Sequence, residues 1–146
     1  MSLPLPQSVK GDSASERLRT LGLKLQVLAG DAYFVHHRTV DSSIHISGQL
    51  PFMDGELLGP GVVGRDVELE TARELARHAA LNALAAAVQA GGDLDRVRMV
   101  QMLVFVASEL LIEVLGEHGR HARTAIGVAG LPLNTPVEIQ MICAAV

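Results

Sequence analysis

The chain has 146 residues, 49% of them hydrophobic and 19% charged, and a formal net charge of -4. This length fits one ordinary domain, expected over residues 1–146, and the apolar content excludes an intrinsically disordered chain. The acidic balance, the absence of Trp and the presence of only one Tyr and three Phe argue against nucleic-acid binding, which favours basic surfaces and stacking aromatic rings.

Other features of the composition limit where the protein can be located in the cell and how it assembles. No apolar run reaches the ~20 residues of a membrane span, and no secretory signal is recognisable, so we expect a cytoplasmic protein that contacts no membrane. Cys143 is the only cysteine, which excludes an intrachain disulfide. A mean hydropathy of +0.30 is high for a small monomer and predicts apolar surface buried in a homo-oligomer.

The chain begins with a predicted arm and a short helix. Residues 1–12 are interrupted by Pro and Gly and are expected to be flexible. Ser13 and Glu16 have the spacing of a capping box, which predicts a peripheral helix that ends near Leu21.

Two hairpins are predicted next. The β-rich runs at 33–40 and 44–47 flank the polar turn Asp41-Ser42-Ser43. The Asp54-Gly55 turn then joins runs at 50–53 and 56–58, which we expect to extend the same antiparallel sheet.

The strongest helix signal covers residues 68–90. Asp66 is the predicted N-cap, and Gly91-Gly92 supplies the left-handed conformation that ends a helix. Small apolar residues recur at three- and four-residue spacing and predict a face that packs closely on a sheet: Ala72, Leu75, Ala76, Ala79, Ala83 and Ala86.

The second half of the chain predicts three strands and a helix. Both faces of the run at 97–106 are mostly apolar, so we expect this strand in the interior of the sheet. Ser108 is a predicted cap for a helix to about residue 117, and strands follow at 124–128 and 137–144. The order βββαβαββ predicts an α/β fold in which two helices cover one sheet.

Two charged residues in the last quarter are the candidate site. If the last two strands pair in a hairpin, Arg123 and Glu138 lie opposite each other on one face. Arg can bind a carboxylate through two parallel hydrogen bonds, and Glu can position a water molecule. An ordinary cross-strand ion pair is the alternative reading of the same spacing.

Several separate stretches resemble the Rid family, also called YjgF or L-PSP proteins. They are Ile46-Ser47-Gly48-Gln49-Leu50-Pro51, Ala80-Leu81-Asn82-Ala83-Leu84, Asp93-Leu94-Asp95-Arg96-Val97, Ala122-Arg123-Thr124-Ala125-Ile126-Gly127-Val128, Leu131-Pro132-Leu133 and Val137-Glu138-Ile139. The resemblance spans about residues 33–144. The N-terminal helix and Gly22 resemble a YjgF-like branch that begins with a short helix.

This resemblance implies a chorismate-mutase-like α/β fold, a homotrimer with ligand clefts between subunits, and hydrolytic deamination of reactive 2-imino acids. In that setting Arg123 would bind the substrate carboxylate with help from the backbone N–H of Ala125. Glu138 would orient the attacking water and handle a proton, and Ser47 and Gly48 would line the cleft. No metal or organic cofactor is expected, because a protonated imine is already electrophilic.

Two positions depart from the family pattern. Phe34 stands where the family usually has Tyr, and the connection at Ala107-Ser108-Glu109 is shorter than usual. These departures favour an alternative function, a non-catalytic trimer that binds small carboxylate metabolites. A ribonuclease, suggested by an older family name, is opposed by the acidic charge.

The histidines and the cysteine have structural interpretations. His36 and His37 are adjacent on a predicted strand and so point to opposite faces, and no third ligand completes a metal site with His118 and His121. Cys143 shares its strand face with apolar residues and is expected in the core.

Overall fold

The computed structural model describes residues 13–30, 33–103 and 108–146, so the predicted arm lies outside the described residues. The helices are α1 (Ala14–Thr20), α2 (Leu69–Gly91) and α3 (Ser108–Leu115), with short 3-10 turns at Leu94–Arg96, Gly116–Gly119 and Pro132–Asn134. The strands are β1 (His37–Val40), β2 (Ser43–Gln49), β3 (Phe52–Met53), β4 (Glu56–Leu57), β5 (Val97–Leu103), β6 (Ala122–Thr124) and β7 (Ile139–Ala145).

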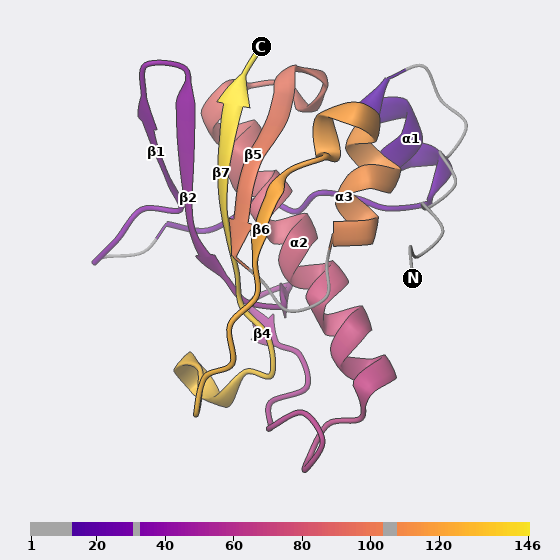
Figure 1. Cartoon of the computed structure of the whole chain (residues 1–146), viewed down its shortest axis with the longest axis vertical. Helices are drawn as coiled ribbons and strands as arrows, with labels where there is room; N and C mark the ends of the chain where they lie inside the picture. Colours follow the sequence, from indigo (N-terminus) through magenta and orange to yellow (C-terminus); the bar gives the residue numbers. More distant parts are fainter. Residues whose placement is uncertain (1–12, 31–32, 104–107) are drawn as a thin grey trace.

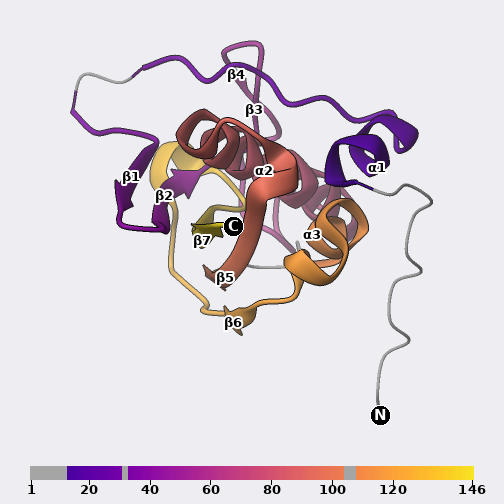
Figure 2. The same cartoon turned by 90° about the horizontal axis from the view of Figure 1, so that it is seen from above.

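One five-stranded sheet organises the fold, in the order β1-β2-β7-β5-β6 (Figure 1). All neighbouring strands are antiparallel except β5 and β6, which are parallel. Seen from above, α2 and α3 lie on one side of the sheet (Figure 2). The predicted α/β architecture with helices on one sheet is confirmed, and β5 is an interior strand as expected.

The helix face of the sheet forms the core. Side chains of the three central strands that point toward α2 are almost fully buried: Ile44, Ile46, Val97, Met99, Met102, Ile139, Met141 and Cys143. Residues of α2 meet them, and Ala76, Ala79, Ala83 and Ala86 have no exposed surface. The small stripe predicted from the sequence therefore brings the helix close to the sheet.

The prediction for α2 is right at the C-terminal end of the helix and wrong at its N-terminal end. Gly92 ends the helix in the left-handed conformation, with φ of 77°, as predicted. Asp66 is not the N-cap, because Glu68 takes that position and its side chain makes no capping bond. The Asp66 carboxylate instead accepts hydrogen bonds from the Val62 N–H and the Arg65 guanidinium within the preceding loop.

The N-terminal segment covers the outer side of α2. Ser13 caps α1 by accepting a hydrogen bond from the Glu16 N–H, as predicted, and Arg17 Nε donates to the Val114 carbonyl at the end of α3. Further along, Gln26 Nε2 donates to Asn82 Oδ1 on α2 at 2.5 Å. This cover explains why residues 81–87 of α2 are buried on every side.

Three strand predictions need correction. β3 and β4 form a separate two-stranded sheet and do not extend the main one. The last strands do not form a hairpin, because β6 pairs with β5 and β5 separates it from β7. The strand expected at 124–128 is wrong, because β6 covers Ala122–Thr124 and residues 125–128 lie outside any strand.

Two predictions concern residues at the edge of the described part of the chain. α3 begins at Ser108, whose hydroxyl lies 3.3 Å from His121 Nε2, and the residues just before it are not described. The predicted strand end at 104–106 and the short connection at Ala107 fall there too. Within the described ranges, no helix has both the length and the apolar character needed to cross a bilayer.

Candidate functional site

A β-bulge lies at Ser47 and Gly48. Ile46 pairs with Met141, whereas Gln49 pairs with Ile139, so β2 carries one more residue than β7 over this stretch. The extra residue lets Ile46 and Gln49 both face the core. The bulge therefore turns the backbone of Ser47 and Gly48 out of the regular alternation, at the point where β7 begins.

The carboxylate of Glu138 rests on Gly48. Glu138 immediately precedes β7 and is half-buried. A Cβ atom at position 48 would overlap the Glu138 carboxylate, standing 2.8 Å from Cδ and 3.2 Å from Cγ. Glycine leaves room for the Glu138 side chain in the position that it occupies, so the bulge and the carboxylate form one local unit.

Hydrogen bonds fix Ser47 from two sides. Its hydroxyl donates to the Val35 carbonyl at 2.6 Å, and its N–H donates to the His36 carbonyl at 2.9 Å. Its own carbonyl accepts from Gln49 Nε2 at 3.0 Å. The structure thus brings together three of the predicted site residues, Ser47, Gly48 and Glu138.

Arg123 lies in a different part of the surface. It pairs with Met102 across the parallel β5–β6 ladder, and Met102 pairs with Met141 of β7. Arg123 and Glu138 are therefore separated by two strand spacings, about 10 Å across the sheet, and by three residues along it. Within the described residues, neither side chain makes a hydrogen bond or ion pair, so the predicted cross-strand pair does not form.

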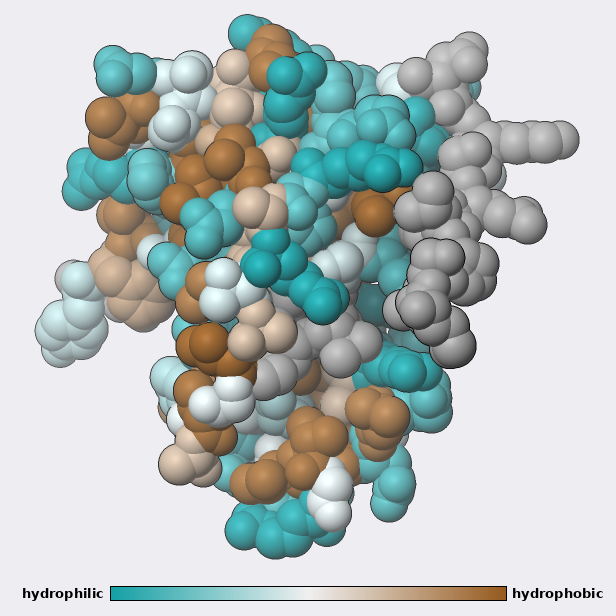
Figure 3. Space-filling model, in the orientation of Figure 1, coloured by the Kyte–Doolittle hydropathy of each residue, from teal (hydrophilic) through white to brown (hydrophobic). Residues whose placement is uncertain are grey.

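The segment that carries Arg123 and Ala125 is open to solvent. Every residue from 122 to 130 is exposed in the single chain, including Ile126 and Val128. Val100 on β5 and Val40 on β1 are also exposed. Apolar side chains thus lie among polar ones on the face of the molecule that Figure 3 shows, and burying them would favour association with another chain.

Phe34 lines a cavity of its own. This cavity of about 490 Å³ lies between the N-terminal segment, β2 and the β3–β4 hairpin, and its lining includes His36, Gln49 and Asn82. The Phe34 ring meets the His36 ring edge-on, with centroids 6.0 Å apart. Neither Arg123 nor Glu138 lines this cavity, so the structure does not bring Phe34 together with them.

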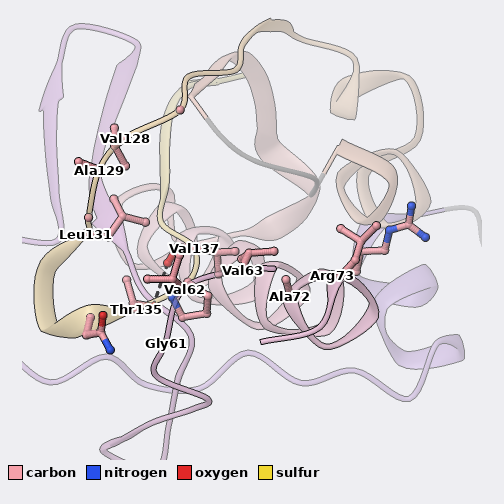
Figure 4. Close-up of a pocket in the computed structure, with 15 residues that line it drawn as sticks. Gly61, Val62, Val63, Ala72, Arg73, Val128, Ala129, Leu131, Thr135 and Val137 are labelled. Atoms are coloured by element: carbon pink, nitrogen blue, oxygen red, sulfur yellow. Dashed lines mark hydrogen bonds between the residues drawn. The ribbon is translucent and has the colours of Figure 1, made fainter. Parts of the chain in front are cut away.

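A second, apolar pocket was not foreseen from the sequence. It has a volume of about 300 Å³ and lies between the loop at 61–63, the first turns of α2 and the loop at 127–137 (Figure 4). Val62, Val63 and Leu131 are among its lining residues. Its parts come from loops distant in sequence, and a hydrogen bond from the Gly61 N–H to the Asn134 carbonyl, 2.7 Å long, joins them. No local pattern could have indicated this pocket.

The histidines and the cysteine have structural contacts. His118 lies 3.3 Å from Arg98 Nη2, and His121 Nδ1 lies 2.6 Å from the Gly119 carbonyl. Burial raises the pKa of the Cys143 thiol to about 12, in agreement with its predicted core position. In the part of the chain that the structure describes, no group of three or more His, Cys, Asp or Glu side chains is arranged to hold a metal ion.

Comparison with known proteins identifies the family. The sequence profile described as Endoribonuclease L-PSP matches residues 26–145. The chain belongs to this family. The L-PSP match includes the bulge, α2, Arg123 and Glu138, and begins after α1.

Relatives support the L-PSP assignment over most of the chain. Protein TCP17 of Trypanosoma cruzi is 36% identical, with 90% of this chain and 93% of that protein aligned. The crystal structure of Atu1372 from Agrobacterium tumefaciens, a protein of unknown function, is 34% identical over 92% of each chain, with a TM-score of 0.80. The YjgF protein of E. coli is 26% identical over 81% of this chain and 92% of its own, with a TM-score of 0.58. The Rid/YjgF resemblance seen in the sequence is thereby confirmed.

Proposed function

We propose that this L-PSP protein hydrolyses reactive 2-imino and enamino acids, such as 2-iminopropanoate and 2-iminobutanoate, to 2-oxo acids and ammonia. The observation that carries the proposal is the Glu138 carboxylate, seated on the Gly48 bulge in a family member that also has Arg123 exposed on β6. The reaction needs an anionic group that orients water and accepts its proton, and a cationic group that binds the substrate carboxylate.

Each residue has one step in the proposed reaction. The Arg123 guanidinium binds the substrate carboxylate through two hydrogen bonds, and the Ala125 N–H donates a third. Glu138 orients a water molecule and accepts a proton as the water oxygen bonds to the iminium carbon. The C–N bond then breaks, the nitrogen leaves as ammonia after receiving a proton, and the carbonyl of the 2-oxo acid forms. Ser47 and Gly48 line the cleft, and no cofactor takes part.

We further propose that each cleft is composite and lies between two copies of the chain in a homotrimer. The Arg123–Ala125 segment of one copy would face the Ser47–Gly48–Glu138 unit of the next. Two observations support this arrangement: the two groups are separated by an intervening strand within one chain, and exposed apolar side chains accompany the Arg123 segment. A closed ring of identical contacts would bury this surface in every copy.

Phe34 favours one alternative function. Its side chain is about half exposed and has no hydroxyl group to take part in proton transfer. In a non-catalytic binder of small carboxylate metabolites, Arg123 would hold the ligand and Phe34 would supply only an apolar wall. The family description names an endoribonuclease, but the net charge of -4 opposes RNA as the ligand.

The test is imine hydrolysis with variants of both groups. 2-Iminopropanoate is generated in situ and the remaining imine is trapped with semicarbazide. We expect wild type to suppress trapping, Arg123→Ala to lower kcat/KM, and Glu138→Ala to lower kcat by about 10²- to 10⁴-fold. Arg120→Ala is the matched control, because Arg120 pairs with Glu117 at 2.9 Å on the surface. A wild type that binds 2-oxo acids but leaves trapping unchanged would reject the deaminase in favour of the binder.

A further inference from the structure

Gln49 is a buried amide at the base of the bulge. The residue is 4% exposed, and its Nε2 atom lies 3.0 Å from the Ser47 carbonyl and 3.3 Å from His36 Nδ1. His36 Nε2 lies 2.6 Å from the Ala29 carbonyl. A chain of hydrogen bonds therefore runs from the N-terminal segment through His36 and Gln49 to the bulge.

The chemistry of these partners fixes their proton positions. The Ala29 carbonyl can only accept a hydrogen bond, so His36 Nε2 donates to it, and in the tautomer with the proton on Nε2 the Nδ1 atom is an acceptor. The Ser47 carbonyl is an acceptor too. Gln49 must therefore present its NH₂ group to both atoms, which uses both of its hydrogens and leaves one orientation of the amide.

We infer that Gln49 is a positioning residue for Glu138. Gln49 donates a hydrogen bond to the Ser47 carbonyl on one side of the bulge. The Glu138 carboxylate packs against the next residue, Gly48. Releasing the carbonyl would let the bulge shift and would displace the carboxylate from the water that it orients. This inference rests on the proposed function only for its effect on turnover, because the effect on the bulge is a property of the fold.

The test replaces Gln49 with Met, which has a similar size and no hydrogen to donate. We expect kcat for imine hydrolysis to fall by about 10- to 100-fold, because a displacement of about 1 Å can cost this much. KM should stay within about 2-fold, since Arg123 and Ala125 bind the carboxylate and do not contact Gln49. A loss of folded protein would also lower the apparent kcat at an unchanged KM, so a control variant of similar stability is needed to separate the two causes.

Gln26→Met is the matched control. Gln26 lines the same cavity and also binds through its amide, donating to the Phe52 carbonyl at 2.7 Å and accepting from the Asp54 N–H at 3.3 Å, but it does not touch Ser47. Loss of the Gln26 amide should lower the denaturation midpoint by about as much as Gln49→Met does, while kcat stays within about 2-fold of wild type. Equal losses of kcat in the two variants would overturn the inference.

A second measurement does not depend on turnover. Amide hydrogen exchange at Ser47, whose N–H donates to the His36 carbonyl, should be at least about 10-fold faster in Gln49→Met than in Gln26→Met. If Ser47 exchanges faster in Gln49→Met but the wild-type protein does not hydrolyse imines, the role of Gln49 in holding the bulge is upheld and the deaminase function is rejected. Unchanged exchange, or an unchanged kcat in an active protein, would overturn the positioning itself.

Discussion

Replacing Gly48 with Ala probes the contact between the bulge and Glu138. The added methyl carbon would stand 2.8 Å from Glu138 Cδ, whereas carbon atoms pack best at about 3.5–4.0 Å. Glu138 Oε1 would lie nearer still to the added carbon, so the carboxylate must move by more than about 1 Å to remove the overlap. Gly48 is not in the left-handed region, so its backbone accepts Ala and the side chain of Glu138 takes up the whole change.

This displacement should separate activity from stability. Turning the Glu138 side chain off its preferred rotamer costs about 0.5–1.5 kcal/mol, and the smaller entropy of unfolded Ala offsets about 0.4–1 kcal/mol of this cost. We expect the free energy of unfolding in urea to change by less than about 1 kcal/mol. Imine hydrolysis, in contrast, should lose about 10²-fold in kcat, because the water that Glu138 orients moves with the carboxylate.

Gly91→Ala is the control for this prediction. A methyl carbon at Gly91 would make an ordinary contact, 3.6 Å from Ile44 Cδ1, far from Glu138 in the chain. This variant should keep the wild-type kcat and gain up to about 1 kcal/mol of stability from the better helix former. If Gly48→Ala were as active as Gly91→Ala, the Glu138 carboxylate on the bulge would have no part in the reaction.

Three further predictions concern the core and the supports of the site. Asn82→Leu removes one hydrogen bond from the Leu50 carbonyl and one from the Phe52 carbonyl, which keep the Phe52 N–H and Gln26 Nε2 as their other donors, so we expect a loss of about 1–2 kcal/mol in urea denaturation. A methyl group at Gly119 would overlap the backbone of Leu111, and Gly119→Ala should lose about 1–3 kcal/mol, also measured in urea. The raised pKa of Cys143 means that its neutral thiol stabilises the fold fully below pH 9, and this contribution is lost as the pH rises toward 12. A thiol reagent at pH 8 should therefore label Cys143 only after denaturant is added; rapid labelling of the folded protein would contradict the burial.

Local patterns predicted the regular parts of the fold well. The spacing of small residues gave the buried face of α2, and Gly92 gave its end, because both depend on neighbours within one or two turns. The Ser13 cap and the core position of Cys143 followed from equally local arguments. Asp66 failed as a cap because the Arg65 guanidinium and the Val62 N–H compete for its carboxylate.

Long-range pairing was the part that the sequence could not determine. A hairpin between the last two strands agreed with their order, but β5 lies between them and pairs with both. The bulge at Gly48 also depends on the register with β7, which alternation alone does not specify. The sequence therefore indicated Arg123 and Glu138 as candidates, but their separation within one chain emerged only from the topology.

Mixing the two inactive variants tests the composite deaminase site most directly. Arg123→Ala and Glu138→Ala proteins are unfolded together, refolded as a 1:1 mixture and assayed for hydrolysis of 2-iminopropanoate. If each cleft joins Arg123 of one copy to Glu138 of the next, about a quarter of the clefts in a random assembly contain both residues, and about a quarter of wild-type activity should return. A mixture that stays as inactive as the separate variants, beside an active wild type refolded in parallel, would contradict the composite site.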